Sequence, residues 1–161
     1  MFTLADVDVY AKTLPGVTVG AKWGRRTWLV GDKGFVWDRP LSKADIKRYG
    51  NAAIPQGEIL GVRVADLDAK DALLAIAPAG FFTIEHFNGY PAVLSELRLA
   101  RAADVRHAIL DAWRTLATPA LEARLATKRT TVKRSTAARV TKRVVTKSPR
   151  TEKRTGKRAT R

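Results

Sequence analysis

All twelve aromatic residues of this 161-residue chain lie in its first 113 positions, and the last of them is Trp113. Burial of bulky apolar side chains supplies most of the free energy that offsets the entropy lost when a chain becomes ordered. The hydrophobic core must therefore be built from the first part of the sequence. We expect a single domain at residues 1–126, long enough for a conventional core, and a distinct segment at residues 127–161.

The C-terminal segment is a polycation. Residues 128–161 hold 14 Lys and Arg against one acid, Glu152, so they carry +13 of the chain's formal net charge of +15. Their four Val follow neither a helical nor a strand period, and their 10 Ser and Thr disfavour a helix interior. Few bulky apolar residues combined with a high net charge are typical of intrinsic disorder. We expect this segment to be disordered on its own.

A flexible polycation suits a partner with closely spaced phosphates. Duplex DNA carries about one negative charge per 1.7 Å of its axis, so such a segment can neutralise many phosphates without adopting one geometry. We expect DNA as the partner, bound mostly without sequence specificity. An RNA- or ribosome-associated protein is the alternative, because a segment that contacts phosphates cannot read the 2′-hydroxyl group. The predicted nucleic-acid contacts are Lys128, Arg129, Lys133, Arg134, Arg139, Lys142, Arg143, Lys147, Arg150, Lys153, Arg154, Lys157, Arg158 and Arg161.

The first part of the chain contains a second basic stretch. Residues 22–48 hold eight Lys and Arg against three Asp, whereas residues 49–127 hold seven basic and nine acidic residues. One interpretation is a face of the domain that contacts phosphates without reading bases. The alternative is a solvated rim in which Arg39 forms a local ion pair. The candidate contacts in the domain are Arg25, Arg26, Lys33, Lys43, Lys47 and Arg48.

Capping residues and apolar periodicity predict the helices. Thr3 caps a helix that ends before "LPGV", and Ser42 caps a short helix that ends at Gly50. A third helix covers "LDAKDALLAIAP". The stretch "RAADVRHAILDAWRTLA" carries the clearest apolar stripe of the chain, and Pro119 opens a short final helix.

Three further stretches predict an antiparallel sheet. "TVGAKWGRRTWLVGDKGFVWDRP" contains strands with a hairpin at Gly31–Gly34, and "EILGVRVADL" is a strand. "GFFTIEHF" and "PAVLSELRL" are two more strands joined by a turn at Asn88–Gly89. Helices interspersed with hairpins predict an α+β fold, a single domain with a largely antiparallel sheet packed with helices.

Three tryptophans lie close together around the first hairpin. A symmetric loop at Asp32–Lys33 would place Trp28 opposite Trp37, whereas a bulge at Gly34 would separate the two rings, so both registers stay open. Core packing is the favoured interpretation for Trp23, Trp28 and Trp37. The alternative is that these rings stack on exposed bases.

The segments "TWLVGDKGFVWDRPLSKAD", "FFTIEHFNGYPAVLSEL" and "AWRTLATPALEARL" resemble the MmcQ/YjbR family of small bacterial proteins, and the likeness covers about Phe2 to Leu125. The resemblance implies an α+β domain related to the frataxin-like (CyaY-like) fold. Members are commonly labelled DNA-binding and share no agreed catalytic motif, so the resemblance implies a DNA-binding protein and no enzyme. Members usually end shortly after the last helix, so the basic segment is an addition.

No residue pattern indicates a metal or a cofactor. Frataxin-like domains bind iron through rows of acids on their first helix, but this chain offers only Asp6 and Asp8, on different faces. His86 and His107 are the only histidines, and no carboxylates are spaced around them as ligands. Neither a GxGxxG nor a Walker-type loop occurs, so we expect no nucleotide cofactor and no metal.

The stretch "EHFNGYP" supports two interpretations. The favoured one is a tight turn between strands, with Phe87 and Tyr90 in the core. In the other, Glu85, His86, Asn88 and Tyr90 form a polar pocket. That pocket would make the domain a ligand-binding or enzymatic module, with the basic segment as a localisation device.

The absence of Cys excludes a disulfide framework and any thiolate metal site. The acidic start of the chain does not have the basic and then apolar pattern of a secretory signal, and no apolar run is long enough to span a membrane. We therefore expect a cytoplasmic, nucleoid-associated bacterial protein, favoured as a monomer, with DNA as its partner and no membrane contact.

Overall fold

The structure is a computed structural model that describes residues 1–128 and 130. The chain divides into two units, Met1–Leu125 and Ala126–Arg161. The expected disorder of the basic segment, and its predicted contacts from Arg129 onward, lie outside the described residues. Lys128 is described and is exposed.

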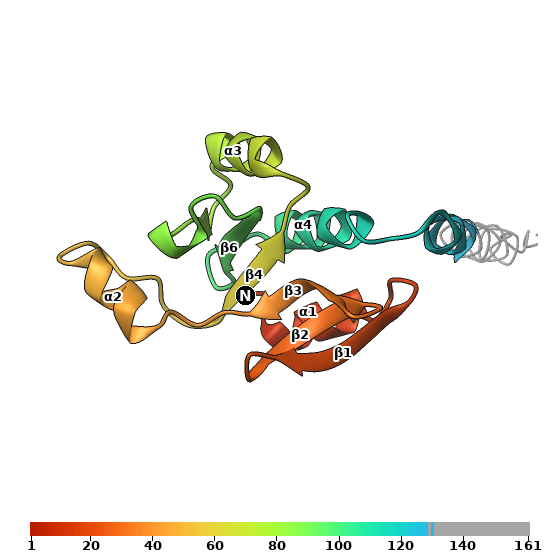
Figure 1. The fold of residues 1–161 in the computed structure, drawn as a ribbon, viewed down its shortest axis with the longest axis horizontal. Helices are drawn as coiled ribbons and strands as arrows, with labels where there is room; N and C mark the ends of the chain where they lie inside the picture. Colours follow the sequence, from red (N-terminus) through yellow and green to blue (C-terminus); the bar gives the residue numbers. More distant parts are fainter. Residues whose placement is uncertain (129, 131–161) are drawn as a thin grey trace, which may run out of the picture. The chain divides into compact units, whose positions relative to one another are not determined.

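The first unit has an α+β fold, so the predicted fold class is confirmed (Figure 1). Its elements are α1 (Leu4–Ala11), β1 (Val17–Lys22), β2 (Arg25–Val30), β3 (Lys33–Asp38), α2 (Lys43–Tyr49), β4 (Ile59–Arg63), α3 (Leu67–Ile76), β5 (Phe81–Phe82), the 3₁₀ helix η1 (Glu85–Phe87), β6 (Ala92–Glu96) and α4 (Ala102–Arg114). A further helix begins at Pro119, as predicted, and Thr118 accepts hydrogen bonds from the backbone of its first turn.

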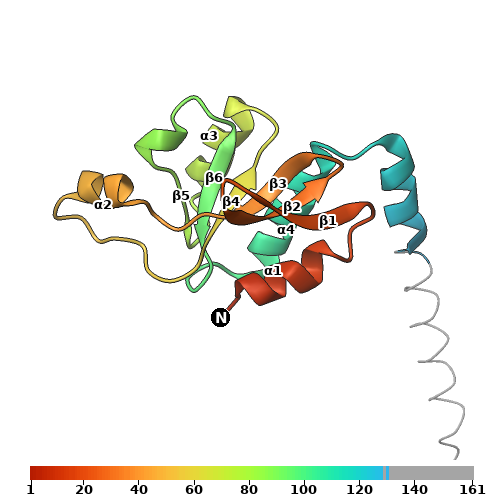
Figure 2. The same cartoon turned by 60° about the horizontal axis from the view of Figure 1, so that its bottom comes forward.

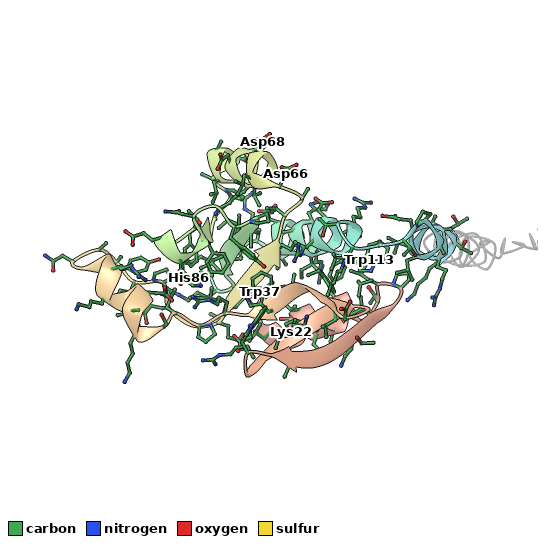
Figure 3. The ribbon with its side chains drawn as sticks, in the orientation of Figure 1. Lys22, Trp37, Asp66, Asp68, His86 and Trp113 are labelled. Atoms are coloured by element: carbon green, nitrogen blue, oxygen red, sulfur yellow. The ribbon has the colours of Figure 1, made fainter. Side chains whose placement is uncertain are left out.

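Side-chain caps hold the helix starts in place, and those at Thr3 and Ser42 were predicted. Thr3 and Asp6 form a capping box at α1, and Ser42 and Asp45 form another at α2. Asp66 caps α3, where its carboxylate accepts a hydrogen bond from the backbone of the first turn (Figure 3). These side chains bind backbone N–H groups that have no partner within the helix.

Among the described residues, six strands form one antiparallel sheet in the order β1-β2-β3-β4-β6-β5. Helices α1 and α4 pack against each other on the same side of the sheet (Figure 2). Their apolar faces bury the main core against Trp28, Phe35 and Leu60. Trp113 projects from α4 into this core, and its indole N–H donates to the backbone oxygen of Pro15 at 3.0 Å.

The hairpin between β2 and β3 contains a bulge. Val30 pairs with Lys33 and Leu29 with Gly34, but Trp28 pairs with Val36, so Phe35 is an extra residue. The sequence left open a symmetric loop at Asp32–Lys33 or a bulge at Gly34, and both are wrong in position, because Gly34 is paired and the bulge falls at Phe35. The expectation that a bulge would separate the two tryptophans is correct. Because side chains alternate along a strand, Trp28 belongs to the main core and Trp37 to the opposite face.

The opposite face of the sheet carries a smaller core. Trp37, Ile59, Phe87, Ala92 and Leu94 are buried together there. The indole of Trp37 lies directly over Gly61 of β4, and a Cβ at that position would collide with the ring. A glycine is therefore required for the tryptophan to lie flat on the sheet.

The predicted strand "GFFTIEHF" is wrong over most of its length, because only Phe81–Phe82 pairs with β6 and Glu85–Phe87 forms η1. The backbone of this segment bonds locally instead, because the N–H groups of Phe87 and Asn88 donate to the carbonyls of Ile84 and Glu85. The buried Lys70 of α3 binds the end of the segment, where its ammonium group donates to the backbone oxygens of Phe87, at 2.5 Å, and Tyr90, at 3.2 Å. The predicted turn at Asn88–Gly89 is confirmed.

Candidate functional site

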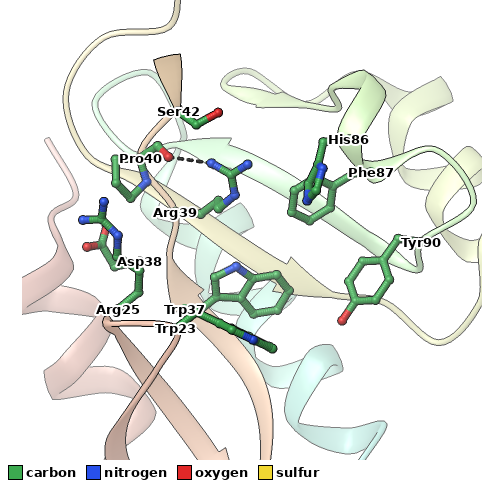
Figure 4. Close-up of a pocket in the computed structure, with 10 residues that line it drawn as sticks. All are labelled: Trp23, Arg25, Trp37, Asp38, Arg39, Pro40, Ser42, His86, Phe87 and Tyr90. Carbon is green, nitrogen blue, oxygen red and sulfur yellow. Dashed lines mark hydrogen bonds between the residues drawn. The ribbon is translucent and has the colours of Figure 1, made fainter. Parts of the chain in front are cut away.

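A cavity of about 520 Å³ opens on the face of the sheet that carries the smaller core (Figure 4). Three segments surround it: the β1–β2 turn, the end of β3 with the residues that follow, and η1 with the turn after it. Its volume falls within the range of roughly 300–1,000 Å³ typical of small-molecule sites. The lining residues are Trp23, Arg25, Trp37, Asp38, Arg39, Pro40, Ser42, His86, Phe87 and Tyr90.

The β1–β2 turn presents Trp23 to this cavity. Lys22 pairs with Arg25, so the loop has two residues, Trp23 and Gly24, with φ of 53° and 71°. Positive φ at both positions is the mark of a type I′ turn, in which Asn–Gly is strongly preferred. A bulky residue in the left-handed region is disfavoured. Trp23 is nevertheless 82% exposed, so it gains little from packing at that position.

Aromatic rings form much of the cavity wall. Trp37 and Phe87 stack with their centroids 6.4 Å apart, and Tyr90 meets Phe87 edge to face at 5.8 Å. His86 also lies edge to face against Phe87. The indole N–H of Trp37 donates to no group in the described part of the chain, and its nitrogen is not fully buried. It is thus a hydrogen-bond donor available to a ligand.

Arg39 is fixed beside the rings. Its guanidinium donates to the backbone oxygen of Pro40 at 2.5 Å and to Oδ2 of Asp45 at 2.9 Å, and it lies 5.6 Å from the centroid of Phe87. Burial raises the pKa of Asp45, but hydrogen bonds from Ser42 and Arg39 outweigh burial and lower this pKa to about 2. Asp45 therefore stays ionised and holds Arg39 in place.

Arg25 and Asp38 lie together on one side of the cavity (Figure 4). Burial raises the pKa of Asp38, and the negative charge of Glu58 adds to this, whereas the positive charge of Arg25 opposes it. Neither side chain has a hydrogen-bond or ion-pair partner among residues 1–128. Arg25 and Asp38 are thus close enough to interact electrostatically, but no ion pair or hydrogen bond within the described range fixes either side chain.

The predicted contacts of the domain do not form one surface. Arg25 lines the cavity, whereas Arg26 pairs with Asp8 at 2.8 Å on the α1 side of the sheet. Lys33 is exposed at the other end of β2 and β3, beside their hairpin loop. The structure thus separates Arg26 and Lys33 from the cavity.

Helix α2 carries the other three predicted contacts. Lys43 and Lys47 are exposed one turn apart, and Arg48 pairs with Glu85 of η1 at 3.1 Å. Arg39 forms a local ion pair, which is the arrangement that the solvated-rim alternative predicted. The helix therefore presents two lysines to solvent, whereas its third cation is paired with η1.

Sequence reasoning missed part of this site. Core packing was correctly predicted for Trp28 and Trp37 but is wrong for Trp23. Phe87 is buried as predicted, whereas Tyr90 is 42% exposed, so its predicted core position is wrong. The Trp23–Gly24 dipeptide between two strands was the available signal, because a two-residue hairpin loop forces its first side chain outward.

The structure does not form the polar pocket of four side chains that was the alternative for "EHFNGYP". His86 and Tyr90 line the cavity, and Glu85 and Asn88 do not. Within residues 1–128, no group of three or more His, Cys, Asp or Glu side chains could hold a metal ion. No helix in the described part of the chain is long and apolar enough to cross a bilayer.

Comparison with known proteins finds mycobacterial relatives. The chain is 40% identical over 113 residues to the uncharacterized protein Rv2570 of Mycobacterium tuberculosis and, equally, to the uncharacterized protein Mb2600 of Mycobacterium bovis. The alignment covers 68% of this chain and 87% of each relative. The chain belongs to their family. The relatives confirm the expectation of a bacterial protein.

No family model matches the chain, and no solved structure matches it. The alignment to the mycobacterial family leaves about a third of this chain outside it.

Proposed function

We propose that this protein binds DNA, mostly without sequence specificity, through its basic C-terminal segment. The observation that carries the proposal is the charge of residues 128–161, which hold 14 Lys and Arg against one acid. At that density a chain can neutralise several phosphates at once, and each neutralised phosphate releases condensed counterion. Contacts of this kind give affinity but little sequence information.

The folded unit adds a weaker contact in this proposal. Lys43 and Lys47 are exposed on α2, and neither is paired with a carboxylate of residues 1–128. Together with Arg48 on the same helix, they form the candidate phosphate contact of the domain. We further propose that the domain is a member of the MmcQ/YjbR family and acts without catalysis, as a nucleoid-associated protein in the cytoplasm.

The nature of the nucleic acid can be tested in cells. The protein is cross-linked in living cells and purified under denaturing conditions, and the attached nucleic acid is digested separately with DNase and RNase. The proposal predicts that most of the material is DNA and that its sequences spread over the genome without a shared motif. Recovery of mostly RNA would contradict it and favour the RNA- or ribosome-associated alternative.

A further inference from the structure

The tryptophan at the β1–β2 turn, beside the cavity, has a backbone conformation and an exposure that the stability of the fold does not explain. Trp23 adopts a backbone conformation that disfavours bulky residues, yet its ring is 82% exposed. Asparagine at this position would suit the turn better, so the fold alone does not favour tryptophan there. Unfavourable backbone conformations of this kind concentrate at ligand sites.

The polar groups of the cavity limit which chemical groups a ligand can carry. Asp45 already balances the charge of Arg39, whereas Arg25 makes no ion pair with any residue of the described range, so Arg25 is the cation that can meet an anionic group of a ligand. Asp38 needs a ligand that also brings an N–H donor, since an anion without one would leave this carboxyl group unpaired. The indole N–H of Trp37 needs an acceptor, and the rings of Trp23 and Trp37 favour a flat partner.

We propose that this cavity binds a nucleotide, with its base against Trp23 and Trp37 and its phosphate at Arg25. A nucleobase is planar and carries N–H donors and ring acceptors on one edge, which suit Asp38 and the Trp37 N–H. The phosphate supplies the anion. The nucleotide is either free or an unpaired residue of a single strand, because both present the same groups. This site is independent of the phosphate contacts of the basic segment.

The site can be observed in the full-length chain by fluorine NMR. Incorporation of 5-fluorotryptophan gives one signal for each of the four tryptophans, and the Trp23→Asn variant assigns the signal of the turn. Titration with GMP at about 150 mM salt should shift the signals of Trp23 and Trp37 in a saturable way. Trp28 and Trp113 are fully buried in the main core, so their signals should not move.

Two variants test the assigned contacts. Arg25→Ala should weaken GMP binding at least tenfold, whereas Lys33→Ala, which removes the same charge outside the cavity, should leave it unchanged. Trp23→Asn should abolish binding and raise the melting temperature, because asparagine suits the turn. A lower melting temperature for Trp23→Asn would contradict the argument that this tryptophan is held there against the preference of the fold.

Further probes separate the sources of the nucleotide. Ribose 5-phosphate, which lacks a base, should not shift the Trp23 signal. A Trp23 shift that saturates with GMP would identify the ligand as a free nucleotide. A shift only with a short single-stranded oligonucleotide would identify it as an unpaired residue of a strand. If neither moves the Trp23 signal, or if a duplex moves it as much as the single strand does, the proposal is overturned. The phosphate contacts of the basic segment would be untouched by that result, since Trp23 reports only on the cavity.

Discussion

Asp45 joins the start of α2 to the wall of the cavity. Its carboxylate accepts hydrogen bonds from the backbone N–H and hydroxyl of Ser42 and from Arg39, while Asp45 itself is buried. These bonds favour the ionised form so strongly that the pKa falls to about 2 from an ordinary value of 3.8. The unfolded chain binds a proton at this carboxyl group more readily than the folded chain does. The ionised carboxylate therefore stabilises the fold at pH values at which it carries its charge.

Replacing Asp45 should therefore have a pH-dependent cost. At pH 7, Asp45→Asn should lower the free energy of unfolding by about 2 kcal/mol, since one unit of pKa corresponds to about 1.4 kcal/mol. The contribution is complete above the unfolded pKa and is lost as the pH falls through the folded pKa. The difference between the two proteins in urea unfolding should thus shrink between about pH 4 and pH 2. A difference that stays constant down to pH 2 would contradict this account of Asp45.

Ser95 of β6, unlike Asp45, is a buried polar side chain without hydrogen bonds in the described part of the chain. Its hydroxyl is fully buried and has no hydrogen-bond partner among the described residues. An unsatisfied buried hydroxyl costs about 1–3 kcal/mol, so Ser95→Ala should leave stability unchanged or raise it. Thr27→Val is the matched control, because the buried Thr27 hydroxyl donates to the backbone oxygen of Arg25. Chemical denaturation should show a loss of about 1 kcal/mol for Thr27→Val, and a comparable loss for Ser95→Ala would contradict the assignment.

Among the elements, the turn after η1 depends on α3. Lys70 of α3 is buried, and its ammonium group holds the carbonyls of Phe87 and Tyr90. These two residues form one wall of the cavity. The shape of the cavity thus depends on a lysine that does not line it.

Lys70→Met keeps much of the side-chain length but removes the donor. The two carbonyls then lose a charged partner, and we expect a loss of about 2–3 kcal/mol in the free energy of unfolding. Amide exchange of Tyr90, whose N–H donates to the carbonyl of Phe87, should become faster. The control is Lys43→Met on the exposed face of α2. Equal effects of the two substitutions on stability and exchange would show that Lys70 is not an anchor.

The elements also show how far sequence reasoning reaches. Capping boxes at Thr3 and Ser42 were predicted because their signals are local and lie within four residues. The strand predicted over "GFFTIEHF" was wrong after Phe82, where the chain forms η1 and the carbonyl of Phe87 binds Lys70, 17 residues earlier in the sequence. Local patterns do not reveal a side chain that competes for backbone carbonyls across the fold.

The cavity was less predictable than the fold for the same reason. His86 and Tyr90 were considered together because they are neighbours in sequence. Trp23 and Arg25 join them only through the pairing of β1, β2 and β3. The exposure of Trp23 depends on a two-residue loop, whose length follows from strand register and not from composition.

At the scale of the whole molecule, the domain should contribute only a minor share of the DNA affinity. Changing both Lys43 and Lys47 to Glu should weaken DNA binding at low salt by a few fold, because each exposed lysine contributes one phosphate contact at most. Such exposed substitutions usually change stability by less than about 0.5 kcal/mol, so the circular dichroism spectrum and melting temperature should hardly change. Unchanged DNA affinity would support the solvated-rim interpretation of this helix.

The order of residues in the basic segment provides a further test of the same claim. A version of the chain in which residues 128–161 are shuffled keeps every charge but destroys any motif. Its DNA affinity should match that of the natural chain, because a polycation that contacts phosphates does not read base edges. A shuffled chain that binds much more weakly in gel-shift titrations would show that the order of these residues is recognised.

The central claim, that residues 128–161 provide most of the DNA affinity, is tested most directly by the dependence of that affinity on salt. If about half of the 14 basic side chains engage at once, a plot of log K against log salt concentration should have a slope of about −6. The matched control is a full-length chain with these 14 residues changed to Gln. Its slope should fall to roughly −1 to −2, because residues 1–127 have a net charge of only +2. Binding is measured between about 50 and 200 mM salt on unrelated duplexes. A neutralised chain that keeps a slope near −6 and most of its affinity would contradict the account.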